Sequence, residues 1–401
     1  MNLSHEKSDG SYKWYVLGLG SLTHALVVAM PVMCMPVLFN EISEDLGLSL
    51  VQVGAIWGVA SVSGMFSGLV GGSAGDRFGI RHTVSIACLL AGVAGAARGI
   101  SGDSLTLTVT SFIYGFLPPA ITPNIHKMCG VWFPGKRLGM ANGVVSAGMA
   151  LGFMMGSLVS ATVLSPWLGG WRNVLFFYGA LSVAVGIPWW KVRSSPDESS
   201  VQEGSRVSLR KALPHVGSLR SVWAYGLITL GIGSCIQGSL GYLPLYLRAL
   251  GWAGPSADGA LATFHGVSLL FTIPLALLSD RCGSRKGILV IATVMTIGGV
   301  GFLSIADGMM IWVLVLLAGI VRDGYMAILM TMVIETEGIG AKYAGTAMGM
   351  TAILYRFGGF FSPPLGNSLA ALNLGLPFVF WAGTAALAFL GLYFVREHAP
   401  G

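Results

Sequence analysis

At positions 72–81 the chain reads Gly72-Ser73-Ala74-Gly75-Asp76-Arg77-Phe78-Gly79-Ile80-Arg81, and at 276–285 it reads Ala276-Leu277-Leu278-Ser279-Asp280-Arg281-Cys282-Gly283-Ser284-Arg285. The second copy repeats the acid, the arginine that follows it, the glycine and the final arginine of the first copy. Each copy connects two long apolar segments. The stretch is a duplicated loop, and it indicates a chain built from two versions of one unit.

A second element repeats with nearly the same spacing. Residues 136–143 read Lys136-Arg137-Leu138-Gly139-Met140-Ala141-Asn142-Gly143, and residues 342–349 read Lys342-Tyr343-Ala344-Gly345-Thr346-Ala347-Met348-Gly349. The lysine, the alanine and both glycines match. Internal duplication in a membrane chain is typical of a transporter whose substrate site lies between the two repeats.

The composition is that of a membrane protein. Apolar residues make up 54% of the chain, charged residues make up 10%, and 58 residues are glycine, so a soluble domain would lack polar surface. No cleavable signal peptide is expected, because the N-terminus is short and polar and the first apolar segment is too long. The five cysteines are scattered, so we expect free thiols, no metal site and no cofactor.

The apolar segments define the architecture. About 20 apolar residues span a bilayer as a helix, and the sequence offers twelve such segments: 14–38, 50–75, 82–100, 105–129, 139–163, 172–192, 220–247, 256–279, 286–305, 310–333, 343–367 and 376–396. The polar stretch 193–218 is the expected linker. We therefore predict an all-α membrane protein with twelve transmembrane helices in two pseudo-symmetric six-helix bundles, 1–192 and 219–401.

The basic residues predict the orientation. With the N-terminus in the cytoplasm, nearly all lysines and arginines fall on the inner side, and only Arg98, Arg172 and Arg248 fall outside. We expect a multi-pass inner-membrane protein with both termini in the cytoplasm. This asymmetry accounts for the net charge of +6, so no nucleic-acid partner is needed.

The repeated Gly-x-x-x-Asp-Arg-x-Gly-x-Arg loop resembles the signature loop of the major facilitator superfamily. The resemblance implies two six-helix bundles that rock about a central site, with the loop as a latch that favours the outward-open state. The expected gating residues are Gly72, Asp76, Arg77, Gly79, Arg81, Asp280, Arg281, Gly283 and Arg285. The alternative is that the loop only anchors the topology. Glycine permits a turn with positive φ, and an aspartate can accept backbone N–H groups at a helix start.

Two further stretches resemble subfamilies. Residues 133–148 resemble the element between spans four and five of monocarboxylate porters and oxalate–formate exchangers, and residues 9–14 loosely resemble the entry to span one in the monocarboxylate porters. Those families often use an arginine in span eight, where this chain offers only His265. Many proton-coupled members carry an arginine four residues before a glycine in span four, where this chain has Ser111 before Gly115.

Span five carries closely spaced glycines. They are Gly139, Gly143, Gly148, Gly152 and Gly156, which we expect to form one small helix face. Small faces let membrane helices pack closely.

Few ionisable residues lie deep in the predicted spans. Arg356 lies about 16–21 Å into span eleven, and Arg322 and Asp323 lie near the middle of span ten, at about 1.5 Å per residue. Adjacent helical residues point about 100° apart, so Arg322 and Asp323 are expected to look to other helices. Arg356 either binds an anionic group of a substrate or forms a structural pair with Asp323. Arg322 is a second candidate for substrate binding, and Asp323 is a candidate proton carrier.

The remaining candidates are weaker. His24 and His265 are possible proton or substrate contacts, or hydrogen-bonded helix contacts. Asn124, Tyr114 and Gln237 could line a cavity.

The sequence favours a secondary active transporter of a small organic anion, a mono- or dicarboxylate, driven by proton symport or exchange. Two deep arginines against one aspartate favour an anion. The alternative is uptake or efflux of another solute (a drug, a metabolite, an inorganic anion or a metal), or, less favoured, a non-transporting membrane sensor. No nucleophile–base set indicates an enzyme. The expected partners are a small solute and membrane lipid, and the chain is expected to be monomeric.

Overall fold

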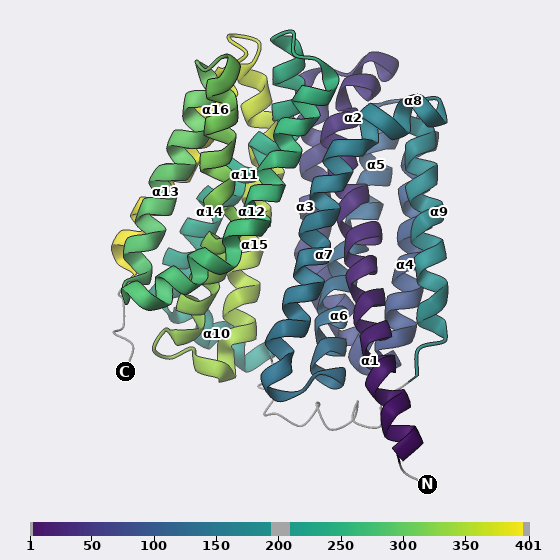
Figure 1. Cartoon of the computed structure of the whole chain (residues 1–401). Coiled ribbons are helices and arrows are strands. Elements are labelled where there is room, and N and C mark those ends of the chain that lie inside the picture. The colour runs from purple at the N-terminus through teal and green to yellow at the C-terminus, as the bar shows by residue number, and fades with distance from the viewer. Residues whose placement is uncertain (1–2, 194–208, 396–401) are drawn as a thin grey trace. The chain divides into compact units, whose positions relative to one another are not determined.

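The computed structural model describes residues 3–193 and 209–395, and within these ranges every regular element is a helix (Figure 1). By internal contacts the chain divides into two compact units. Unit 1 comprises residues 1–46 and 66–204, and unit 2 comprises residues 47–65 and 205–401. The all-helical membrane architecture is confirmed, whereas the boundaries 1–192, 193–218 and 219–401 stay a prediction.

Unit 1 holds the first helices of the chain, except the first half of α3. Its elements are α1 (Leu3–Thr23), η1 (His24–Ala29), α2 (Met30–Leu46), the second half of α3 (Leu50–Phe78), α4 (Ile80–Ala97), η2 (Arg98–Ile100), α5 (Ser104–Gly115), α6 (Pro118–Trp132), η3 (Gly135–Arg137), α7 (Leu138–Val159), η4 (Ser160–Leu164), α8 (Ser165–Leu168) and α9 (Trp171–Trp190). The elements η1 and η4 are π-helical turns within longer helical segments. The break between α5 and α6 falls at Pro118, because proline cannot donate to the preceding turn.

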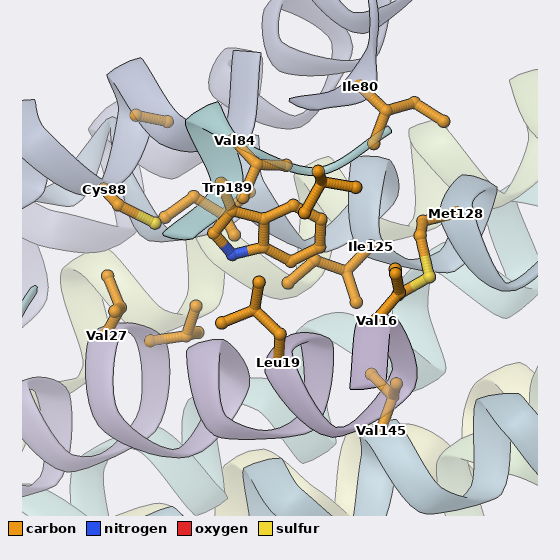
Figure 2. Close-up of a cluster of buried hydrophobic side chains, with 14 of the residues drawn as sticks. Val16, Leu19, Val27, Ile80, Val84, Cys88, Ile125, Met128, Val145 and Trp189 are labelled. Carbon is orange, nitrogen blue, oxygen red and sulfur yellow. The ribbon is translucent and has the colours of Figure 1, made fainter. Parts of the chain in front are cut away.

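Trp189 anchors an apolar core in unit 1. Figure 2 shows its indole among Leu19, Val84 and Ile125, which come from different helices and are buried. The indole Nε1 donates a hydrogen bond to Thr23 Oγ1 at 2.8 Å, so the one polar atom of this large side chain is satisfied inside the core.

Three glycines bring α7 against the first helical segment. A Cβ atom added at Gly148 would lie 2.6 Å from the Ser21 carbonyl oxygen, and one at Gly152 would lie 2.6 Å from the Ala25 carbonyl oxygen. Gly156 makes the same kind of approach to Met30. This part of the predicted small face packs as expected.

The other two glycines of that stretch do not share the packed face. A Cβ atom at Gly139 or Gly143 would meet nothing within 4 Å. Their inclusion in the face was wrong, because steps of four and five residues drift around a helix with 3.6 residues per turn.

Unit 2 holds the later helices and the first half of α3. Its other elements are α10 (Leu209–Ser218), α11 (Arg220–Ala249), α12 (Gly254–Cys282), α13 (Arg285–Gly301), η6 (Phe302–Ser304), α14 (Gly308–Glu335), α15 (Gly340–Leu369) and α16 (Leu376–Phe394). The helix α10 lies inside the stretch expected to be a polar linker.

The helix α11 lies at the centre of unit 2, buried along most of its length. Thr229 Oγ1 donates to the Thr351 carbonyl of α15 at 2.9 Å, and Ser362 Oγ donates to the Ser234 carbonyl at 2.7 Å. These bonds satisfy hydroxyl groups that have no access to water and fix α15 beside α11.

Ten helical segments of the described chain are long and apolar enough to cross a membrane. An eleventh forms if Leu50–Met65 and Val70–Phe78, which meet at 46°, are one bent span of α3. The helix α15 has 30 residues but does not meet the same hydropathy criterion. It contains Arg356, Asn367 and two internal prolines, which lower its apolar character. The count of twelve spans therefore stays a prediction.

Candidate functional site

Arg356 lies in the middle of α15 and is partly buried. Among residues 3–193 and 209–395, no carboxylate lies within ion-pair distance of its guanidinium, and no side-chain hydrogen bond involves it. It approaches the first half of α3, where a Cβ atom at Gly64 would lie 2.8 Å from Arg356 Cζ. A guanidinium within a span and without an acid is a candidate anion-binding group.

Tyr355 connects Arg356 to the charged residues of α14. Its phenol lies within electrostatic range of Arg322, Arg356 and Asp323. Two neighbouring helices of unit 2 thus contribute two arginines, one aspartate and one phenol to a single region. The net charge of this cluster is +1, because the aspartate offsets one of the two arginines.

Arg322 is held by side chains of its own helix and of α12. Its Nη1 donates to His265 Nδ1 of α12 at 2.9 Å, and its Nε lies 3.5 Å from Asp323 Oδ1. Its Cζ lies 5.7 Å from the centroid of the Phe264 ring. Because the arginine can only donate, His265 Nδ1 accepts, and the imidazole carries its proton on Nε2. His265 therefore serves as a partner of Arg322 in this structure.

The Asp323 carboxylate lies close to the Arg322 guanidinium, which the sequence did not lead us to expect. Its backbone N–H donates to Ser268 Oγ at 3.2 Å, and its side chain keeps about a third of its surface exposed, at 35%. The prediction that Arg322 and Asp323 do not face each other was wrong, whereas Arg322 does reach another helix through His265. The arginine side chain is long and turns back along its own helix, so the 100° between adjacent positions does not separate the charged ends.

The expected Asp323–Arg356 pair is not formed among the described side chains. The carboxylate is engaged by Arg322, and this leaves Arg356 as the arginine without a neutralising acid. Whether these residues act in transport stays a prediction.

Gln237 lies on α11, near the same part of α15. Trp57 Nε1 of α3 donates to the Gln237 backbone carbonyl at 2.7 Å. A Cβ atom at Gly359 would lie 3.3 Å from Gln237 Cγ and 2.9 Å from Ser61 Oγ. The Gln237 and Ser61 side chains therefore approach α15 about one helical turn beyond Arg356.

His24 lies in unit 1 and is fully buried at the start of η1. Its ring makes an edge contact with His126 of α6, with centroids 5.6 Å apart. His126 Nδ1 lies 2.9 Å from Asn142 Oδ1 of α7. The structure thus brings a predicted residue together with a histidine and an asparagine that the sequence reasoning did not assign to a site.

Asn124 fastens α6 to the second half of α3. Its Nδ2 donates to the Gly71 carbonyl at 2.8 Å, and Gly75 leaves room for its amide. Because Asn124 is fully buried and holds two helices together, the contacts of its Nδ2 are those of a packing residue.

Tyr114 is buried beneath Arg98, an arginine that the sequence analysis placed on the outer side of the membrane. The Arg98 guanidinium lies 3.9 Å from the centroid of the Tyr114 ring, and Arg98 Nη2 donates to the Pro31 carbonyl at 3.2 Å. Arg98 is only 2% exposed, so it lies inside the protein, and the sequence analysis did not predict this. Its position at the end of an apolar segment gave no sign of this burial.

Both signature loops turn at a glycine with positive φ. Gly79 has φ 83° and Gly283 has φ 65°, a region that glycine enters at little cost, so the predicted turns are confirmed. In the first loop, Arg81 Nη1 donates to the Val192 carbonyl at 3.2 Å, and Arg77 lies over the Phe78 ring.

Their acids have different partners. Asp76 pairs with Lys127 of α6 at 2.8 Å. In the second loop Arg285 pairs with Asp280 at 3.1 Å and also with Glu335 of α14, while Arg281 is exposed. The loops share a glycine with positive φ, but ψ is 150° at Gly79 and 6° at Gly283, and the loops are tied to different helices.

The family model of the Major Facilitator Superfamily matches residues 19–363. The chain belongs to this superfamily. Major facilitator superfamily proteins are multi-pass membrane transporters, and they are generally not enzymes.

Its curated relatives include two named for anions. A probable sulfoacetate transporter of Cupriavidus necator is 26% identical over 355 residues, which cover 80% of this chain and 79% of the relative. A probable nitrate/nitrite antiporter of Thermus thermophilus is 27% identical over 421 residues, covering 94% and 90%.

The solved structures agree with the superfamily fold. A bacterial homologue of the human lysosomal transporter Spinster, in an inward-facing and unoccupied conformation, matches 96% of each chain with a TM-score of 0.77 and 16% identity. This likeness concerns the fold alone.

Proposed function

We propose that this major facilitator superfamily protein is a secondary active transporter of a small organic anion, a mono- or dicarboxylate, working by alternating access. The observation that carries the proposal is Arg356, a guanidinium in the middle of α15 with no acidic partner among the described side chains. A buried charge without a partner is costly, so binding an anion there lowers the free energy of the loaded site. A guanidinium also matches a carboxylate through two parallel hydrogen bonds.

The surrounding charges support the same class of solute. Arg322, Arg356 and Asp323 leave a net charge of +1, which one carboxylate group neutralises. The relatives named for sulfoacetate and for nitrate or nitrite both carry the names of anions. The Asp323 side chain keeps part of its surface exposed, so we assign it the proton-carrying role in proton-coupled transport.

A binding experiment on purified protein tests this assignment. Acetate, oxalate, sulfoacetate and nitrate are titrated against the wild type by calorimetry and by thermal shift, since a ligand of the folded state raises the unfolding temperature. Arg356→Ala should weaken the best anion about 10- to 100-fold, because a hydrogen bond to a charged group contributes about 1.5–3 kcal/mol. Arg356→Lys should weaken it less.

The control is Arg172→Ala, which removes an arginine from an exposed pair with Asp45. It should leave the affinity unchanged. Equal affinity in the wild type and in Arg356→Ala would overturn the assignment of Arg356, and with it the main support for an anionic solute.

An inorganic anion is the second candidate, favoured by the relative named for nitrate and nitrite, which aligns with 94% of this chain. The same guanidinium would serve it. Preference for nitrate over all carboxylates in the titration would select this alternative.

The excess of basic residues on one side of the predicted spans supports the orientation. We propose an inner-membrane location with both termini in the cytoplasm, a monomeric carrier, and gating by the two signature loops. Cysteine accessibility on the intact cell tests the orientation: Cys282 lies exposed within the second signature loop and should react with a membrane-impermeant reagent only after the membrane is opened.

A further inference from the structure

The first half of α3 lies against α15 through residues without side chains. A Cβ atom at Gly54 would lie 2.8 Å from the Pro363 carbonyl oxygen, and one at Gly58 would lie 2.5 Å from the Phe360 carbonyl oxygen. Both glycines meet backbone, which cannot move without displacing a helix. They permit a close approach of two helices and nothing more.

Gly64 differs from them in what it meets. A Cβ atom there would overlap Arg356 Nη1, and it would lie 2.8 Å from Cζ and 3.4 Å from Nε. The nearest atoms are thus the charged end of the candidate anion-binding residue, which rests directly over the Gly64 backbone. Gly64 is itself buried, so the guanidinium is enclosed on this side by α3.

Because of this arrangement, a substitution at Gly64 can change the position of the Arg356 guanidinium without lowering the stability of the fold. The guanidinium is the movable end of a side chain with several rotatable bonds, so the protein can accept a methyl group at Gly64 by moving Arg356. The fold then survives while the charge leaves its position. A Cβ atom at Gly64 would lie nearest Nη1, Cζ and Nε, so Nη2 is the guanidinium nitrogen farthest from that position.

We propose that Gly64 is a positioning residue of the anion site, which sets the place of the Arg356 guanidinium by lacking a side chain. The inference rests on the proposed function and deepens it, because it assigns the first half of α3 to the wall of the site. Any larger residue at position 64 shifts the charged group and weakens anion binding without unfolding the protein.

The chain supplies matched controls on the same helix. Gly58→Ala meets backbone at 2.5 Å and should lower the unfolding temperature. Gly68→Ala would place its Cβ 3.7 Å from the Pro119 carbonyl oxygen, an ordinary contact, and should change neither stability nor binding. Gly64→Ala should resemble Gly68→Ala in stability, and should resemble Arg356→Lys in binding.

The experiment measures the unfolding temperature and the affinity for whichever anion of the panel (acetate, oxalate, sulfoacetate, nitrate) the wild type binds best. Gly64→Ala should weaken binding about 10-fold, the loss expected when one charge-assisted hydrogen bond is misaligned. Lysine has no Nη1 atom. In the Arg356→Lys background, Gly64→Ala should therefore weaken anion binding much less, because contacting residues act non-additively. Gly68→Ala should have the same effect in both backgrounds.

The outcomes are distinct from those of the proposed function. Loss of binding in Arg356→Ala together with wild-type affinity in Gly64→Ala would overturn the positioning role and leave the anion site intact. A fall in unfolding temperature for Gly64→Ala as large as that for Gly58→Ala would also overturn it, because the glycine would then serve packing. Absence of anion binding by the wild type would contradict the proposed function itself. In that case the position of Arg356 is measured directly: its rate of modification by phenylglyoxal should change in Gly64→Ala and not in Gly68→Ala, and an unchanged rate in Gly64→Ala would overturn the inference.

Discussion

Lys127 Nζ lies 2.8 Å from Asp76 Oδ1 and 2.7 Å from the Gly72 carbonyl oxygen, so one amino group of α6 ties down two positions of the first signature loop. The equivalent acid of the second repeat, Asp280, pairs with Arg285 five residues further along the chain. The first pair joins residues 51 positions apart on different helices, whereas the second is local. Repeat-related acids therefore restrain different parts of the protein.

We expect Asp76→Asn to slow transport more than Asp280→Asn. The first change loosens the loop from α6, while the second leaves Arg285 bound to Glu335 of α14. Initial uptake rates in proteoliposomes, normalised to inserted protein, measure the difference. The first loop has Gly72 where the second has Ala276, but this difference does not explain the asymmetry, since a Cβ atom at Gly72 would lie an ordinary 3.9 Å from Lys127 Nζ. Equal rates in the two variants would contradict the asymmetry.

Gly152→Leu should destabilise the protein by about 1–3 kcal/mol or more, because a side chain at this position overlaps the backbone of η1. Gly148→Leu should behave in the same way. Gly143→Leu is the matched control on the same helix, since its Cβ would meet nothing within 4 Å. Thermal unfolding in detergent compares the three. A normal unfolding temperature for Gly152→Leu would show that α7 can move away from η1 freely.

Asp258→Ala should be among the most destabilising single changes in unit 2. The carboxylate is fully buried and lies 2.8 Å from Arg248 Nη1, so its removal leaves a largely buried cation and should cost about 3–5 kcal/mol. Asp45→Ala removes the partner of Arg172 from an exposed pair and should cost at most about 1 kcal/mol. Chemical or thermal unfolding of both variants tests the contrast, and similar losses would show that burial of the pair is not what matters.

Asp323→Asn should retain anion binding and exchange but lose the dependence of uptake on a pH gradient. The amide keeps the shape of the side chain and cannot take up a proton. Counterflow at equal pH and uptake with an imposed gradient separate the two activities. His265→Gln is the comparison, because a glutamine carbonyl can still accept from Arg322. Gradient-driven uptake by Asp323→Asn at the wild-type rate would remove this residue from the coupling step.

Sequence patterns predicted the features that depend on local geometry. The recurrence of Gly79 and Gly283 indicated two turns with positive φ, and both are present. The long apolar segments and the scarcity of charged residues predicted the all-helical membrane fold, which the superfamily match confirms.

Features that depend on where a long side chain ends were less predictable. The depth of Arg356 follows from counting residues, but its lack of an acid depends on Arg322 turning back to Asp323. Arg98 stands at the end of an apolar segment, and only the fold shows that it stacks on Tyr114. Gly64 is one of many small residues in its segment. Nothing in its sequence surroundings distinguishes it from Gly58, and only the guanidinium above it does.

The division of α3 between the two units sets an order of assembly. Residues 47–65 emerge from the ribosome early, yet the helices they contact belong to a unit that resumes at residue 205. At about 5–20 residues per second, this segment is synthesised on the order of 10 s or more before α11 and α15 are complete. The hydrogen bond from Trp57 to Gln237 forms only then. Until the second half of the chain has been translated, the first half of α3 therefore lacks the helices against which it packs.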